Sequence, residues 1–170
     1  MGYVNDDKMT QFIPPWQFQG ATGTYTIAAG AVAGTWAFHR AAAASTGVVT
    51  IPILPPGNSG AARNKGSLLK SIEVDYELLL AGATSVTAAL AKVTRGANGA
   101  VAVVSAVTIT QDQAAAVAAA TQGQHKLTVT VTTPEWHSNA AYYFLNLTCV
   151  CGATVTLDFL GAIVNYTFKA

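Results

Sequence analysis

The sequence predicts an all-β fold, an antiparallel two-sheet sandwich of jelly-roll type with about eight strands. Residues 68–80, LLKSIEVDYELLL, alternate apolar and polar side chains with a period of two, as a half-buried strand does. Further short alternating or apolar segments follow, separated by turn formers. Hydrophobic residues make up 51% of the 170 residues, which is ample for the core of one domain. An immunoglobulin-like sandwich is the alternative, but its Cys…Trp…Cys spacing is absent.

Residues 1–20 are predicted to form an extended N-terminal arm, and residues 21–170 the single domain. The pair Pro14-Pro15 interrupts regular structure in a segment that nevertheless carries large apolar side chains. Such side chains are costly in water, so we expect the arm to dock, either on its own domain or on a neighbour. The candidate docking residues are Phe12, Ile13, Trp16 and Phe18.

The first half of the domain is predicted to hold strands at residues 24–28, 35–39 and 47–54. Pro52 places the last of these at a sheet edge or at its own end. Turn formers concentrate in residues 55–67 and predict a long loop.

The second half predicts a denser series of strands. The segments are 68–80, 85–93, 101–110, 126–132, 142–151, 154–159 and 162–168. The apolar face changes parity between the last two segments, which predicts a bulge at Gly161. Capping-box spacing from Thr110 to Gln113, followed by an alanine-rich run to Gly123, predicts one short crossover helix, with a strand as the rival interpretation.

Three acids, Glu73, Asp75 and Glu77, share the polar face of the segment at 68–80. Alternate side chains on a strand are about 7 Å apart and diverge, which disfavours a shared calcium ion. We expect a solvated or partner-facing stripe on the outside of a sheet, with Lys92 or Arg95 on a neighbouring strand as candidate ion-pair partners.

No local motif for catalysis or metal binding is present. His39, His125 and His137 have no second ligand at H-x-H or H-x-x-x-H spacing. Cys149 and Cys151 stand two apart in a predicted strand, which is poor geometry for a mutual disulfide, so we expect buried thiols.

Folding can still bring together two acids that are far apart in the sequence to form an active site. Glu135 and Asp158 are one such pair, considered as the two carboxylates of a glycosidase and not favoured, because some such pair can be chosen in any chain with eight acids. The prediction is therefore a protein that is not an enzyme, with no catalytic, metal or cofactor-binding residues and no cofactor.

The charge distribution limits the classes of partner. Nine basic and eight acidic residues give a net charge of +1 and are spread along the chain, which argues against nucleic acid and anionic membrane surfaces. No uncharged apolar segment is long enough to span a membrane, and the first residues do not resemble a signal peptide. Charged residues are only 10% of the chain, so we expect other subunits to cover much of its surface.

Five segments between residues 66 and 168 carry a resemblance to a known class: KGSLLKSIEVDYELL, VTAALAKVTRG, HKLTVTVTTPEW, AYYFLNLTC and GAIVNYTF. In the pattern and composition of their strands, these segments resemble the jelly-roll decoration, or cement, proteins of tailed bacteriophage capsids and related virion components. The resemblance implies a structural protein on the capsid surface, often a homotrimer, which bridges major capsid subunits and is commonly held by a terminal arm. Residues 1–20 would be that arm.

Two alternatives stay open. One is a carbohydrate- or receptor-binding module of a phage tail or spike, with Trp136, Tyr142 and Tyr143 around the TPEWHSN loop stacking on a sugar ring. The other is a jelly-roll main capsid protein.

Overall fold

The computed structural model describes residues 6–30, 34–54, 66–78, 85–94, 103–112, 123–135 and 141–169. These residues form twelve strands and one 3-10 turn. In chain order they are β1 (Asp6–Ile13), η1 (Pro15–Gln17), β2 (Gln19–Thr22), β3 (Tyr25–Ala29), β4 (Trp36–Arg40), β5 (Thr46–Ile53), β6 (Gly66–Leu78), β7 (Ser85–Thr94), β8 (Val103–Val107), β9 (Ile109–Gln111), β10 (Gly123–Val131), β11 (Ala141–Val150) and β12 (Leu157–Lys169). No helix among the described residues is long and apolar enough to cross a membrane.

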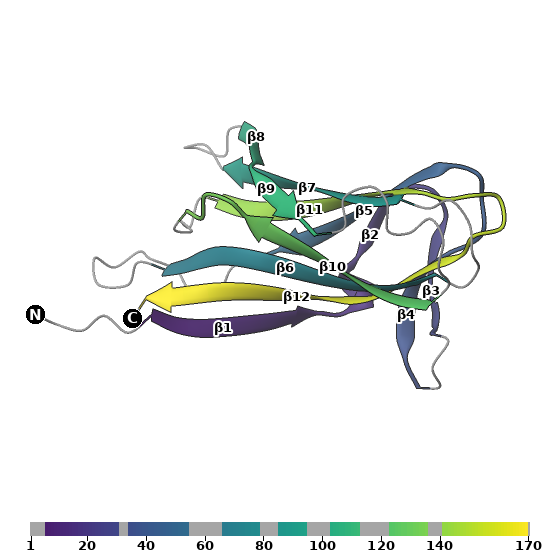
Figure 1. Cartoon of the computed structure of the whole chain (residues 1–170), viewed down its shortest axis with the longest axis horizontal. Coiled ribbons are helices and arrows are strands. Elements are labelled where there is room, and N and C mark those ends of the chain that lie inside the picture. The colour runs from purple at the N-terminus through teal and green to yellow at the C-terminus, as the bar shows by residue number, and fades with distance from the viewer. Residues whose placement is uncertain are drawn as a thin grey trace, which may run out of the picture.

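Two antiparallel sheets pack face to face (Figure 1). Sheet A has the order β3-β4-β12-β6-β10-β9, with β1 also paired to β12, and sheet B has the order β2-β5-β11-β7-β8. Strands β4 and β1 share one side of β12: β4 pairs with residues 157–159, and β1 with residues 162–169.

The strand order is that of a jelly roll, so the predicted fold is confirmed. From β4 to β7 successive strands alternate between the sheets, as do β10, β11 and β12, and the central four of sheet A (β4-β12-β6-β10) face four of sheet B (β5-β11-β7-β8). Strands β1, β2, β3 and β9 extend this arrangement beyond the eight strands that the sequence predicts.

The core lies between the sheets, and the alternation in β6 builds one side of it. Ile72 and Val74 are fully buried, and Tyr76 and Leu78 are 2% exposed. Burying each such side chain contributes about 1.5–3 kcal/mol. The acids between them are only partly buried, which confirms that β6 is apolar on one face and acidic on the other.

The predicted bulge at Gly161 is present. Phe159 lies opposite Tyr76 and Gly161 lies opposite Asp75, so Leu160 is the extra residue. Gly161 has φ +146°, a conformation that favours glycine. The bulge falls between the part of β12 that pairs with β4 and the part that pairs with β1.

The predicted helix start is wrong. Ile109–Gln111 forms β9 and pairs with Val129–Val131 of β10. Asp112, expected in the first helical turn, instead accepts a hydrogen bond from the backbone N–H of Thr128 at 2.8 Å. Pairing to the edge of β10 therefore outweighs the local capping-box signal. Residues 113–122, the rest of the predicted helix, lie outside the described residues.

Candidate docking surface and polar sites

The predicted arm is the outer strand of sheet A on the β12 side. β1 pairs with β12 from Asp6↔Lys169 to Ile13↔Ala162, so this segment docks on its own domain (Figure 1). Pro14 then ends the strand, as expected, and η1 follows.

The four candidate docking residues divide into two pairs. Ile13 is 1% exposed and Phe18 is 4% exposed, and both belong to the core. The ring of Phe18 packs against Phe38 and Phe159, with centroids 6.2 and 6.1 Å away. In this structure Ile13 and Phe18 therefore stabilise the domain itself and are not available to a partner.

Phe12 and Trp16 are 58% and 62% exposed. The strand alternation turns Phe12 away from the core side occupied by Ile13, and η1 presents Trp16 just after the buried Pro15. The Phe12 ring rests on Gly161: a Cβ built there would lie 2.7 Å from its Cε2 atom. We call Phe12, Trp16 and strand β1 the aromatic edge.

The backbone of β1 is paired on one side only among the described residues. Its other side presents N–H and C=O groups to which a further strand can pair. Lys8 is exposed on this strand, and a charged side chain of this kind limits non-specific edge pairing.

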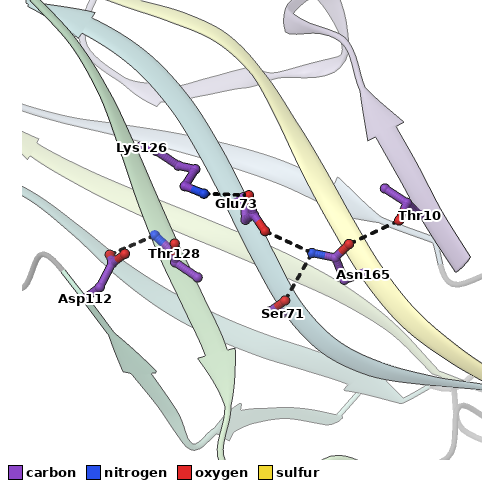
Figure 2. A network of polar contacts seen from close by, with 7 residues as sticks. All are labelled: Thr10, Ser71, Glu73, Asp112, Lys126, Thr128 and Asn165. Carbon is purple, nitrogen blue, oxygen red and sulfur yellow. Dashed lines mark hydrogen bonds and ion pairs between the residues drawn. The ribbon is translucent and has the colours of Figure 1, made fainter. Parts of the chain in front are cut away.

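A polar network crosses the outer face of sheet A beside this edge (Figure 2). The amide of Asn165 on β12 donates to Ser71 Oγ at 3.2 Å and to Glu73 Oε1 at 3.3 Å, and its oxygen accepts from Thr10 on β1. Lys126 on β10 donates to the other oxygen of Glu73 at 3.1 Å. These contacts connect β1, β12, β6 and β10 across the outer face of sheet A.

Within the acidic stripe of β6, Glu73 is therefore held by hydrogen bonds to its own sheet. Its predicted partner Lys92 is wrong, because β7 lies in the other sheet and Lys92 pairs with Glu135 there; Arg95 lies outside the described residues. Burial, and secondarily the neighbouring Glu73, raises the pKa of Asp75, while Lys126 opposes the shift.

The glycosidase pair considered from sequence is not assembled. Asp158 lies opposite Glu77, which lies opposite Gln124 near the start of β10. Glu135 follows the other end of β10, and the run from Gln124 to Val131 alone spans about 23 Å at roughly 3.3 Å per residue. Glycosidase carboxylates lie about 5–10 Å apart.

The two histidines within the described residues have structural neighbours. His39 Nδ1 lies 2.5 Å from Oδ1 of the buried Asp158, across the β4–β12 pair. His125 stacks on Tyr76, with ring centroids 5.4 Å apart. His137 lies outside the described residues. Within the described part of the chain, no group of three His, Cys, Asp or Glu side chains is arranged to hold a metal ion.

A cavity of about 280 Å³ opens between the sheets where the chain crosses from β8 to β9. Its lining combines the Lys92–Glu135 ion pair and Tyr143 with apolar side chains such as Leu69 and Val131. The hydrogen bond that Lys92 donates to Glu135 raises the pKa of Lys92, so this ammonium is charged at neutral pH.

The predicted aromatic platform for a sugar is not formed by the two tyrosines. Tyr143 is buried, whereas the half-buried Tyr142 projects from the other face of β11, where it packs edge-on against Phe144. Trp136 lies outside the described residues.

Cys149 and Cys151 are buried thiols outside any disulfide of the described residues, as expected. Burial raises the pKa of Cys149 to about 12, so its thiol is neutral at physiological pH.

Comparisons with known proteins identify no family. Neither a protein-family model nor a curated protein matches the sequence. Among solved structures, an arabinose-bound α-L-arabinofuranosidase aligns with a TM-score of 0.43 and 7% identity. The alignment covers 91% of this chain and 24% of that enzyme, so the chain spans about a quarter of the enzyme's length. A likeness this weak carries no argument about activity.

Proposed function

We propose that this chain is a non-enzymatic structural protein of a virion, a decoration protein that binds major capsid subunits and reinforces the shell. The observation that carries the proposal is the aromatic edge: Phe12 of β1 and Trp16 of η1 are exposed, and the backbone of β1 is paired on one side only among the described residues. The jelly-roll architecture, which capsid proteins commonly use, and the low charge content add support.

Docking would work by burial of apolar surface and by strand pairing. Phe12 and Trp16 would each contribute about 1.5–3 kcal/mol on burial, before the cost of ordering the interface is subtracted. A partner strand added to β1 would satisfy its free N–H and C=O groups. Repetition of these contacts on a symmetric shell, with the chain as a homotrimer, would turn modest single affinities into high avidity.

The test is co-sedimentation of purified protein with virus particles that lack it. Trp16→Ala and Phe12→Ala should each weaken binding about 10- to 100-fold, because 1.4 kcal/mol corresponds to a factor of ten. Val104→Ala is the matched control, since Val104 is 66% exposed on β8, in the other sheet. Equal binding by all four proteins would refute the docking role of the aromatic edge.

Deletion of residues 1–18 is not a clean version of this test. It would remove β1 together with Ile13 and Phe18, and so open the core of the domain. Point substitutions of the two exposed side chains avoid this effect.

The cavity between the sheets favours a second candidate function, a carbohydrate-binding module. Charged and hydroxyl groups around an apolar floor are the usual composition of a small polar ligand site. Binding on a glycan array that is lost in Lys92→Met would support this candidate, and an array without binding would count against it.

A further inference from the structure

Arg40 is a buried cation without a carboxylate partner. It lies on β4, is 1% exposed, and is the one Lys or Arg among the buried residues that the structure describes. Its Nη2 atom donates to the backbone oxygen of Ser45 at 2.7 Å and to Ser45 Oγ at 2.9 Å. Its Nη1 atom is buried and has no hydrogen-bond partner among the residues that the structure describes. One side of the guanidinium thus holds the β4–β5 loop, and the other side is unsatisfied.

A second unsatisfied group lies beside it. Tyr25 faces Arg40 across the β3–β4 pair, and its hydroxyl is also buried without a partner. The ring is fixed by stacking on Phe38, with centroids 4.9 Å apart and planes within 3°. A Cβ built on Gly47 would clash with both the Tyr25 hydroxyl and Arg40 Nε, so the two polar groups converge over one glycine of β5.

No acidic side chain of the described residues is paired with Arg40 at this position. All eight acidic residues lie in described segments, so the other segments contribute none. None of the ion pairs of the structure involves Arg40. Asp158, beside the residue that pairs with Arg40, points to the opposite face of β12 and contacts His39.

The remaining acids are remote or turned away. The three acids of β6 face outward on sheet A, Glu135 pairs with Lys92, and Asp112 binds the backbone of β10. Asp6 and Asp7 pair near Lys169, about 40 Å along β12 from Leu157 at roughly 3.3 Å per residue. The nearby Cys149 is neutral, because burial raises its pKa to about 12.

We propose that Arg40 and Tyr25 bind a small oxyanion, a carboxylate or phosphate group, at the β4–β5 end of the sandwich. A buried guanidinium without a counter-ion is strongly unfavourable, and it carries only donors, so its ligand must be an acceptor with negative charge. Ser45 already accepts from Nη2, so the donors left for the anion are Nη1 and the Tyr25 hydroxyl, which lies with Arg40 Nε over Gly47. The covering loop, residues 41–45, is exposed, so the site lies one layer below solvent.

The test is an NMR titration of the isotope-labelled full chain, following the side-chain N–H signal of Arg40. Sodium acetate and sodium phosphate are the probes, and sodium chloride controls for ionic strength. The wild-type signal should shift and saturate with acetate or phosphate. Tyr25→Phe should weaken that binding at least about fivefold, because it removes one hydrogen bond to a charged group.

Arg40→Met should stay folded and lose the saturating response of signals around Tyr25 and Gly47. If it fails to fold, Tyr25→Phe decides the question, since its hydroxyl has no other partner. A response that never saturates, or one identical in wild type and Tyr25→Phe, overturns the proposal.

The oxyanion can come from a second copy of the chain or from a free small molecule, and dilution of the protein distinguishes the two sources. Without added anion, an Arg40 signal that starts at its saturated position and moves on dilution indicates a carboxylate from a second copy of the chain. A signal that responds only to added anion indicates a free ligand.

Discussion

Replacement of Gly161 by alanine probes the point where β12 changes partners. Gly161 has φ +146°, and a non-glycine residue in this region costs about 1–3 kcal/mol. The added Cβ would lie 2.7 and 2.8 Å from two atoms of the Phe12 ring and 3.2 Å from the Ile13 carbonyl oxygen. The Phe12 ring must shift, and the carbonyl is held in the β1–β12 pair, so we add about 1 kcal/mol for the two contacts together. The expected loss of unfolding free energy is about 2–4 kcal/mol.

Gly123 provides the matched control. It has φ +136°, but a Cβ built there meets nothing within 4 Å. Gly123→Ala therefore carries the backbone strain without the contact with β1. Urea unfolding followed by tryptophan fluorescence gives both free energies from the midpoint and slope.

The double variant Phe12→Ala/Gly161→Ala isolates the contact. Removing the ring should relieve part of the clash, so the two substitutions should be non-additive by about 0.5 kcal/mol or more. Equal losses in Gly161→Ala and Gly123→Ala, together with strict additivity in the double variant, would refute the claim that β1 packs on the bulge.

Three further predictions concern the titration of Asp75, the reactivity of Cys149, and the stability of variants at Phe18 and Trp16. Asp75→Asn should be more stable than wild type at pH 7, and the difference should vanish below the ordinary carboxyl pKa. The reason is that burial raises the pKa of Asp75, so the stability of the wild type falls as the pH rises through that raised value. Urea midpoints of the two proteins that run parallel across this pH range would contradict this prediction. Cys149 should resist alkylation at pH 8 in the native protein and react in urea, because its pKa is raised to about 12; rapid native modification, read by mass spectrometry, would disprove it. Phe18→Ala should lose about 3–5 kcal/mol of stability, whereas Trp16→Ala should change it by less than about 0.5 kcal/mol; similar values for the two would show that the buried and exposed assignments are wrong.

The sequence was most informative where one physical signal dominated. From Ile72 to Leu78, the period of two predicted which face of β6 is buried, and the parity change at Gly161 predicted the bulge. The alternation does not extend to the start of the segment, where Leu69 is buried and Lys70 is exposed, because Lys70 is an extra residue in the β6–β12 register. Both signals are local, and burial between two sheets reinforces them.

Prediction failed where distant pairing competed with local pattern. Asp6–Ile13 has a weak strand pattern, yet it forms β1 because β12 offers a long edge with a matching register. Likewise, the capping-box pattern at Thr110 did not start a helix, because this segment pairs with the edge of β10. No local signal could assign Lys92 to Glu135, because that pair depends on which sheet each strand joins.

The polar groups of the proposed oxyanion site were equally inaccessible to sequence reading. Tyr25, Arg40 and Gly47 lie on three strands of two sheets, and the topology alone brings them together. A useful clue was the small number of acids: with only eight in the chain, a buried arginine has few counter-ions available.

The central claim is that this jelly roll is a component of a virus shell, attached through its aromatic edge. The most direct measurement is quantitative mass spectrometry of gradient-purified particles from cells that produce the chain with its neighbouring proteins. We expect a fixed ratio of this chain to the major capsid protein, and a lower ratio in particles made with Trp16→Ala. Recovery of the wild-type chain only in particle-free fractions would contradict the account.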